Sequence, residues 1–222
     1  SAASGTRSDS GFEISSEDGD RFASEKLIFA TGIRDVMPDI AGFADCWGIS
    51  ILHCPYCHGY EVRNRKTAIL GNGEYAYEFG KLISNWTKDL TLLTNGSSGL
   101  TAEQTKRIKD FDIEIVEQEI GMILQSNGEV ERVVFKDGSE ISVSAIYTRL
   151  PFQQNSDIPE KLGCEMTSDG YIFVDAFQRT SIPGVFACGD NSTSFRTLSG
   201  AVAAGTLAGI TLNKEIIEDR FR

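Results

Sequence analysis

The middle of the chain alternates short apolar runs with stretches in which apolar residues recur every three or four positions. Residues 67–71 read Thr-Ala-Ile-Leu-Gly, which predicts a buried strand. A helix is predicted after it, with one apolar face formed by Tyr75, Phe79, Leu82, Ile83 and Trp86. Two more strands, at 90–94 and 113–116, flank a second predicted helix at 102–109. This strand–helix–strand order predicts a parallel sheet with right-handed crossovers.

The pattern changes to a period of two after residue 120. Tight-turn pairs at Asn127-Gly128 and Asp137-Gly138 predict an antiparallel meander with strands at 122–125, 130–135 and 141–147. Near the start, Asp18-Gly19 predicts a hairpin with strands at 12–15 and 26–30. The last third predicts a buried strand within 184–188 and a helix rich in small residues over 199–213.

Charge excludes some partners. The chain has 222 residues and a formal net charge of −11, from 21 Lys and Arg against 32 Asp and Glu. Such an acidic protein repels nucleic-acid phosphates and anionic lipid, so we expect neither nucleic acid nor a membrane as partner. No apolar stretch approaches the ~20 residues needed to cross a bilayer, and residues 1–6 lack the features of a signal sequence, so we expect a cytoplasmic protein.

Two of the five cysteines stand close together, in Cys54-Pro55-Tyr56-Cys57, and His58 follows at once. A Cys-x-x-Cys pair keeps one thiolate available for disulfide exchange, and an adjacent imidazole can hold or deliver the proton. Two alternatives remain. The segment Cys54 to His58 also fits the c-type haem attachment pattern, and His53 adds a fourth candidate ligand for zinc. Redox chemistry is the preferred interpretation, and we predict no metal.

A glycine-rich turn, Gly71-x-Gly73-x-x-Ala76, stands between a predicted strand and helix, where glycines allow a pyrophosphate to approach a helix N-terminus. A plain βα turn without ligand explains the pattern equally well, so NAD(P)H binding stays open. No Arg or Lys for a 2′-phosphate occurs in residues 94–98, which disfavours a preference for NADPH.

A second candidate ligand site lies near the end of the chain. Gly189-Asp190 places a carboxylate at the carboxyl end of a predicted strand, where it can hold a ligand hydroxyl or cap a helix. Arg196-Thr197-Leu198 opens the last predicted helix, so a guanidinium and a helix N-terminus can face negative charge there. A solvated arginine is the alternative for Arg196.

Together these motifs resemble the thioredoxin reductase family. Residues Ala30-Thr31-Gly32 are similar to the strand-end motif that returns the chain from the flavin domain, Cys54 to Gly59 match the redox motif, and 181–190 match the second flavin motif. The resemblance implies an α/β, Rossmann-type two-domain flavoprotein disulfide reductase fold. It divides the chain into 1–36 and 150–222, two parts of an FAD domain, and 37–149, an inserted pyridine-nucleotide-type domain that carries the cysteines.

Two departures refine the resemblance. The reductases usually have Asp where His58 stands, and residues 54–61 are more similar to the branch that includes dithiol oxidases of the gliotoxin and holomycin type. The opening FAD-binding βαβ unit with its Gly-x-Gly-x-x-Gly is absent, so we expect an N-terminally truncated fold that binds FAD weakly or not at all by itself.

The resemblance also implies roles. It makes Cys57, beside His58, the flavin-proximal thiol and Cys54 the thiol that attacks the disulfide form of the substrate. The substrate it implies is a small dithiol or a thioredoxin-like protein, and the protein it implies is a homodimer. Cofactor contacts are expected at Thr31, Gly32, Gly71, Gly73, Gly189, Asp190, Arg196, Thr197 and Leu198. We expect Cys54 and Cys57 to be close enough to bridge and the other three cysteines to stay unpaired. The alternative is a catalytically inactive, truncated nucleotide-binding or interaction module.

Overall fold

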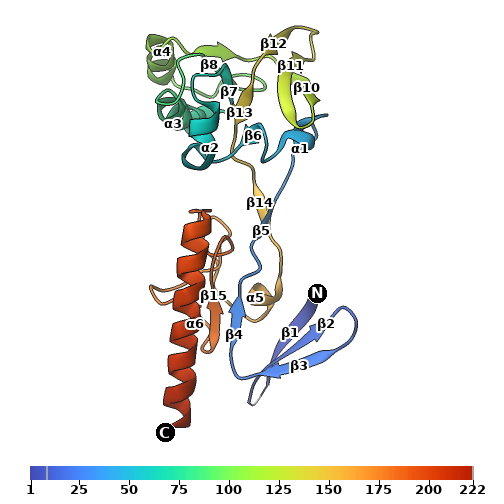
Figure 1. Cartoon of the computed structure of the whole chain (residues 1–222), viewed down its shortest axis with the longest axis vertical. Helices are drawn as coiled ribbons and strands as arrows, with labels where there is room; N and C mark the ends of the chain where they lie inside the picture. Colours follow the sequence, from blue (N-terminus) through green and yellow to red (C-terminus); the bar gives the residue numbers. More distant parts are fainter. Residues whose placement is uncertain (9, 222) are drawn as a thin grey trace. The chain divides into compact units, whose positions relative to one another are not determined.

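The computed structural model describes residues 1–8 and 10–221 (Figure 1). Two compact units are present, one formed by Ser1–Asp35 with Phe152–Arg222 and the other by Val36–Pro151. We call them the split unit and the central unit. Among the described residues, no helix is both long enough and apolar enough to span a membrane.

A parallel sheet forms the middle of the central unit. Its strand order is β6-β13-β7-β8-β9, and every neighbouring pair is parallel. The strands are β6 (Ile51–Leu52), β7 (Thr67–Leu70), β8 (Leu90–Leu93), β9 (Glu114–Val116) and β13 (Ala145–Tyr147). The helices are α1 (Phe43–Cys46), α2 (Pro55–Val62), α3 (Gly73–Ile83) and α4 (Ala102–Asp110). The parallel sheet and its crossover helices confirm the predicted α/β, Rossmann-like arrangement.

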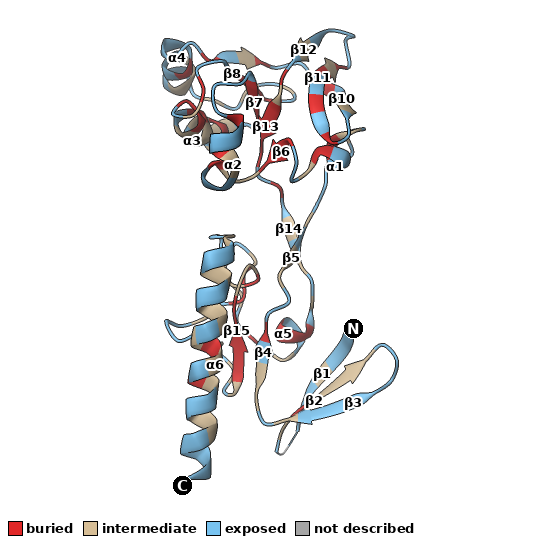
Figure 2. Cartoon of the chain, in the orientation of Figure 1, coloured by how far each residue is buried: buried red, intermediate tan, exposed pale blue. Residues whose placement is uncertain are grey.

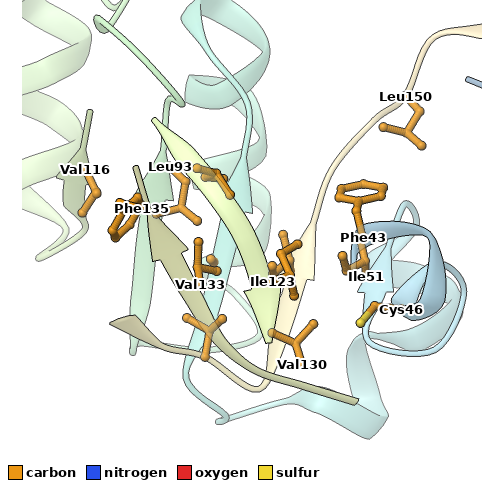
Figure 3. Packing of buried hydrophobic residues seen from close by; sticks show 14 residues of the cluster. Phe43, Cys46, Ile51, Leu93, Val116, Ile123, Val130, Val133, Phe135 and Leu150 are labelled. Atoms are coloured by element: carbon orange, nitrogen blue, oxygen red, sulfur yellow. The ribbon is translucent and has the colours of Figure 1, made fainter. Parts of the chain in front are cut away.

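Side chains leave the two faces of this sheet into two separate cores. One face packs against α1 and an antiparallel meander of β10 (Ile120–Ser126), β11 (Glu129–Phe135) and β12 (Glu140–Ser142). Figure 3 shows this core, in which Phe43, Leu93 and Val133 have no exposed surface. The other face packs against α2, α3 and α4, through residues that include Leu52, Ile83 and Tyr147. Each strand in the middle of the sheet is therefore buried on both sides, as parallel sheets usually are.

The predicted strand at 141–147 is wrong as a single element. It divides into β12, which completes the meander, and β13, which lies in the parallel sheet between β6 and β7. The difference follows from burial: Ile141 is half-buried at a sheet edge, whereas Ala145, Ile146 and Tyr147 are completely buried. A run apolar at every position belongs in a sheet that is covered on both faces.

The predicted hairpin at the start also needs correction. The turn at Asp18-Gly19 joins β2 (Gly11–Ser16) to β3 (Arg21–Ser24), and β1 (Ala2–Ser8) adds a third antiparallel strand. The apolar residues that follow form β4 (Leu27–Phe29) instead, which pairs in parallel with β15 (Val185–Ala187). A short parallel pair suits an apolar run better than an exposed hairpin edge does.

The rest of the split unit is built from β5 (Ile33–Asp35) paired with β14 (Phe152–Gln154), a short helix α5 (Ile158–Lys161) and a long helix α6 (Leu198–Arg220). Helix α6 extends seven residues beyond the predicted end at 213 because no glycine or proline stops it and Lys26 and Arg179 form ion pairs with Glu215. Figure 2 shows α6 mostly exposed, and Ala208 and Thr211 are its buried residues.

Candidate active site

The two close cysteines stand at the beginning of α2. Cys54 is the N-cap residue, with extended backbone (φ −125°, ψ 109°), and Pro55 occupies the first helical position, where its missing N–H is not needed. The backbone N–H of Cys57 donates a hydrogen bond of 3.2 Å to the Cys54 sulfur. The Cys54 sulfur therefore accepts a backbone donor at a helix N-terminus.

The second thiol behaves differently. A hydrogen bond with Cys54 is the main cause that raises the pKa of Cys57 to about 11, followed by burial and by the charge of Cys54. Two thiols this close titrate together, and the first negative charge stays on one sulfur. Cys54 is half-buried and Cys57 is exposed, while His58, next in α2, is half-buried.

The remaining cysteines show no such arrangement. Cys46, Cys164 and Cys188 are buried, and burial is the main cause that raises the pKa of each thiol. None of the five cysteines is joined in a disulfide in the structure. Among the described residues no group of three or more His, Cys, Asp or Glu side chains is placed to hold a metal ion.

Two large side chains, Trp86 and Tyr147, pack beneath α2. The sequence pattern gave neither of them a role in the site. Gly59 lies so close to Trp86 that an added Cβ would stand 2.8 Å from the indole ring. Tyr147, at the end of β13, is completely buried, and its hydroxyl has no hydrogen-bond partner among the described residues. The sequence signal for Tyr147 is a polar hydroxyl at the end of an otherwise apolar strand. The period-two pattern masks this signal, because it assigns the residue to the meander.

The glycine-rich turn is filled by its own side chains. Asn72 caps α3, and its Oδ1 accepts hydrogen bonds from the backbone N–H groups of Gly73 (2.8 Å) and Gly99 (2.7 Å). Gly73 has φ +59°, and a Cβ on Gly71 would lie 2.6 Å from the Tyr75 ring, which explains the need for glycine at both positions. Both glycines therefore have structural reasons that do not require a ligand.

Four of the predicted cofactor residues come together in the split unit. Because β4 and β15 are parallel neighbours, Thr31-Gly32 and Gly189-Asp190 follow adjacent carboxyl ends. Asn191, which the sequence analysis missed, joins them: its Nδ2 donates to the Phe29 carbonyl (2.8 Å) and to the Thr31 hydroxyl (3.3 Å). The signal for Asn191 was its place directly after Gly189-Asp190.

The other predicted residues of the split unit open α6. Thr197 is the N-cap, and its hydroxyl accepts a hydrogen bond from the Gly200 N–H (3.1 Å), while Leu198 is 83% exposed. The Arg196 guanidinium forms an ion pair of 2.7 Å with Asp35, and both side chains are largely buried. Arg196 is thus not a solvated arginine, since its charge is balanced inside this unit.

The predicted residues therefore fall into two groups, one in each unit. Cys54, Cys57 and His58 lie at the start of α2 in the central unit, while Thr31 to Gly32, Gly189 to Asp190 and Arg196 to Leu198 belong to the split unit. The cysteine pair lies at a helix N-terminus of the unit that contains the parallel sheet. The profile of the pyridine nucleotide-disulphide oxidoreductase family matches residues 3–205.

The chain belongs to this family. Within it the chain is thioredoxin reductase-like. Thioredoxin reductase tcpT of Claviceps purpurea is 32% identical over 237 residues, which cover 98% of this chain and 70% of that protein. The structure of the putative thioredoxin reductase TrxB from Bacillus anthracis superposes with a TM-score of 0.92 at 28% identity, over 99% of this chain and 74% of that one. HlmI gives a TM-score of 0.91 at 26% identity, over 99% of this chain and 70% of that one.

Membership in this FAD-dependent disulfide oxidoreductase family implies a flavin, and the split unit fits part of one. Asn191 is completely buried, yet its Oδ1 has no hydrogen-bond partner among the described residues, as expected where a ligand hydroxyl can donate. Gly32 (φ +63°) and Gly189 (φ +86°) allow a close approach of backbone and ligand. These residues suit the hydroxyl-rich part of a flavin.

Proposed function

We propose that this protein is a flavin-dependent dithiol/disulfide oxidoreductase that works through Cys54 and Cys57. The observation that carries the proposal is the hydrogen bond from the Cys57 N–H to the Cys54 sulfur at the start of α2. It favours negative charge on Cys54, and the raised pKa of Cys57 keeps the second proton on the other sulfur. The pair thus combines one nucleophile with one protonated thiol.

Thiol–disulfide exchange at this pair takes two steps. The Cys54 thiolate attacks one sulfur of a substrate disulfide, a mixed disulfide forms, and the released substrate thiolate takes up a proton. Cys57 then loses its proton and attacks the Cys54 sulfur, which closes the Cys54–Cys57 disulfide and releases the second substrate thiol. Two electrons pass from the pair to the substrate, and the reverse sequence oxidises a dithiol.

Roles within the pair follow from the same asymmetry. We assign Cys54 to the substrate and Cys57 to electron exchange with FAD, which supplies two-electron chemistry when bound. His58 directly follows Cys57, and we assign it the proton that Cys57 must lose before it attacks. Asn191, Asp190 and Thr31 would hold the hydroxyl-bearing part of the flavin.

The substrate class is a small dithiol or a thioredoxin-like protein. Cys57 is exposed and Tyr56, between the cysteines, is 77% exposed, so a disulfide on another molecule can reach the pair. The similarity of residues 54–61 to dithiol oxidases favours the small dithiol. A homodimer in the cytoplasm and an absence of NADPH preference complete the proposal. A catalytically inactive module is not favoured, because the family match extends across both units.

The pair can be tested by redox titration of the protein. The chain is equilibrated in mixtures of oxidised and reduced dithiothreitol, free thiols are alkylated, and peptide mapping identifies each disulfide. We expect one reversible two-electron transition with Cys54 and Cys57 as its only participants. A transition that persists in Cys54→Ser, or one that involves Cys164 or Cys188, would contradict the proposal. Cys46→Ser is the matched control, since it removes a buried thiol of the same unit.

A further inference from the structure

Tyr147 lies beside the segment that leads into the redox helix. Strand β13, which it ends, pairs in parallel with β6, and Tyr147 stands opposite Leu52, two residues before Cys54. The N–H of Thr148 donates to the Leu52 carbonyl at 2.9 Å, which continues this pairing past the tyrosine. Tyr147 is thereby held in register with the chain just before Cys54.

The side chain of Tyr147 points to the helical side of the sheet. It belongs to the core that contains Leu52 and also Val62, the last residue of α2. Because paired residues of parallel strands share a face, the phenol ring lies in the layer between the sheet and α2. Its exposed fraction is 0%, so the hydroxyl lies in a water-excluded layer next to the cysteine helix.

This hydroxyl is a donor without an acceptor among the described residues. A buried hydroxyl that makes no hydrogen bond is unfavourable, so such groups are rare and call for an explanation. The pKa of Tyr147 is raised to about 12, first by burial and then by the negative charges of Cys54 and Glu61. The phenol therefore keeps its proton at neutral pH.

We propose that the Tyr147 hydroxyl is an internal hydrogen-bond donor to negative charge on the Cys54 sulfur during thiol–disulfide exchange. The proposal rests on the proposed role of Cys54 and adds a residue from the sheet to it. From α2 the sulfur accepts the Cys57 N–H and lies beside the Cys57 thiol, and Glu61 of the same helix adds negative charge near Tyr147. Tyr147 acts from the sheet as a positioning residue, and it stabilises the thiolate before attack and when Cys54 is the leaving group.

The test measures the pKa of one thiol. In a Cys57→Ser background, Cys54 is alkylated with iodoacetamide between pH 5 and pH 10, and its rate is followed by mass spectrometry. We expect Tyr147→Phe to raise the Cys54 pKa, with an alkylation rate about three- to tenfold lower at pH 7 and an unchanged limiting rate at high pH. A hydroxyl with only a packing role would leave this pH profile where it is.

The matched control is Tyr75→Phe. The Tyr75 hydroxyl is also buried without a partner among the described residues, and its pKa is raised by burial, but the charge near it is that of Arg149 instead of Cys54. An unchanged profile in Tyr147→Phe, or an equal shift in Tyr75→Phe, would overturn the proposal. The alkylation measurement needs neither disulfide formation nor flavin. It can therefore contradict the role of Tyr147 while the redox titration supports the Cys54–Cys57 pair, and it can support the role of Tyr147 while the titration contradicts the pair.

Discussion

Two helices of the central unit begin in similar ways and end up with different chemistry. At the start of α2, the Cys54 sulfur accepts a backbone N–H from Cys57, and at the start of α3, the Asn72 oxygen accepts one from Gly73. Both helices follow parallel strands, so both N-termini offer the positive end of a helix dipole. The difference lies in the cap: a thiol can carry charge and exchange bonds, whereas an amide can only close the turn.

The amide cap also reaches further than the thiol. Asn72 Nδ2 donates to the carbonyls of Ser97 (2.9 Å) and Thr94 (3.4 Å), so one side chain joins the α3 turn to the loop after β8. Among the described residues the Cys54 sulfur accepts one backbone N–H, at 3.2 Å, and Cys54 remains half-buried. A helix start is therefore available for chemistry when its cap is reactive and has few other partners.

The largest expected effect comes from Cys54→Ser, which separates the chemical role of this cap from its structural role. Serine keeps a good N-cap, so we expect a stability change within about 0.5 kcal/mol by chemical denaturation. Disulfide exchange should fall by at least about a thousandfold, because a hydroxyl cannot form a disulfide. Loss of stability together with activity would mean that the thiol acts mainly as a cap.

A smaller effect concerns the pH dependence of Cys57. The pKa of this thiol is raised to about 11 chiefly by Cys54, so at pH 9 Cys57 is mostly protonated in the native protein. Cys54→Ser removes both the hydrogen bond and the negative charge, which lowers the pKa of Cys57 toward its usual range and increases the thiolate fraction. Alkylation of Cys57 at pH 9 should then be about 20- to 50-fold faster. An equal or slower rate would show that burial, not Cys54, controls this thiol.

For stability the order of the two caps is reversed. We expect the loss of the Asn72 side chain to destabilise the protein more than the replacement of Cys54. Asn72→Ala removes four hydrogen bonds to the backbone, so we expect unfolding to become easier by about 1–3 kcal/mol, measured by urea denaturation. Asn85→Ala, at an exposed position of the same unit, is the matched control with an expected change within about 0.5 kcal/mol. If Asn72→Ala is as mild as the control, the turn is held by its glycines alone.

Periodic patterns predicted strands β7, β8 and β9 of the central sheet. They did not predict β6 at its edge or the place of β13 beside β6. The apolar runs at β7 and β8 and the helical spacing of α3 are local signals, so a single sequence is enough to detect them. Strand β6 has only the two residues Ile51–Leu52, and β13 pairs with it across almost a hundred positions of sequence. Such long-range pairing has no local signature, which is why Tyr147 was placed in the meander.

The candidate site was predictable where its chemistry is carried by short motifs. Cys54, Cys57 and the Gly189-Asp190 turn were visible from residue type and spacing. The ion pair of Arg196 with Asp35 and the hydrogen bonds from Asn191 to Phe29 and Thr31 were not, because each joins residues that are about 160 positions apart. The sequence also did not show that Asn72 closes the glycine-rich turn, because an Asn at that position is compatible both with a turn that binds a ligand and with one that does not.

The loop after β8 is the place where a pyridine nucleotide's 2′-phosphate is read in related folds. Here the polar groups of the loop form hydrogen bonds with one another and with neighbouring residues. The Thr94 hydroxyl donates to the Gly96 carbonyl (2.7 Å), and Asn95 Oδ1 accepts from the Ile120 N–H (2.7 Å). The Glu117 carboxylate accepts from the Ser98 N–H (2.8 Å), so a negative charge already stands at this loop.

The smallest expected effect is therefore the difference between NADPH and NADH. A 2′-phosphate adds negative charge, and residues 94–98 offer it no Lys or Arg while Glu117 would repel it. We expect the dissociation constants of the two nucleotides, measured by calorimetry, to agree within about threefold or to favour NADH. Glu117→Gln sharpens the test: it removes the repulsion, so it should strengthen NADPH binding more than NADH binding. NADPH binding that is at least tenfold tighter in the native protein would mean that a cation reaches the phosphate from another segment and that the α3 turn is open to a nucleotide.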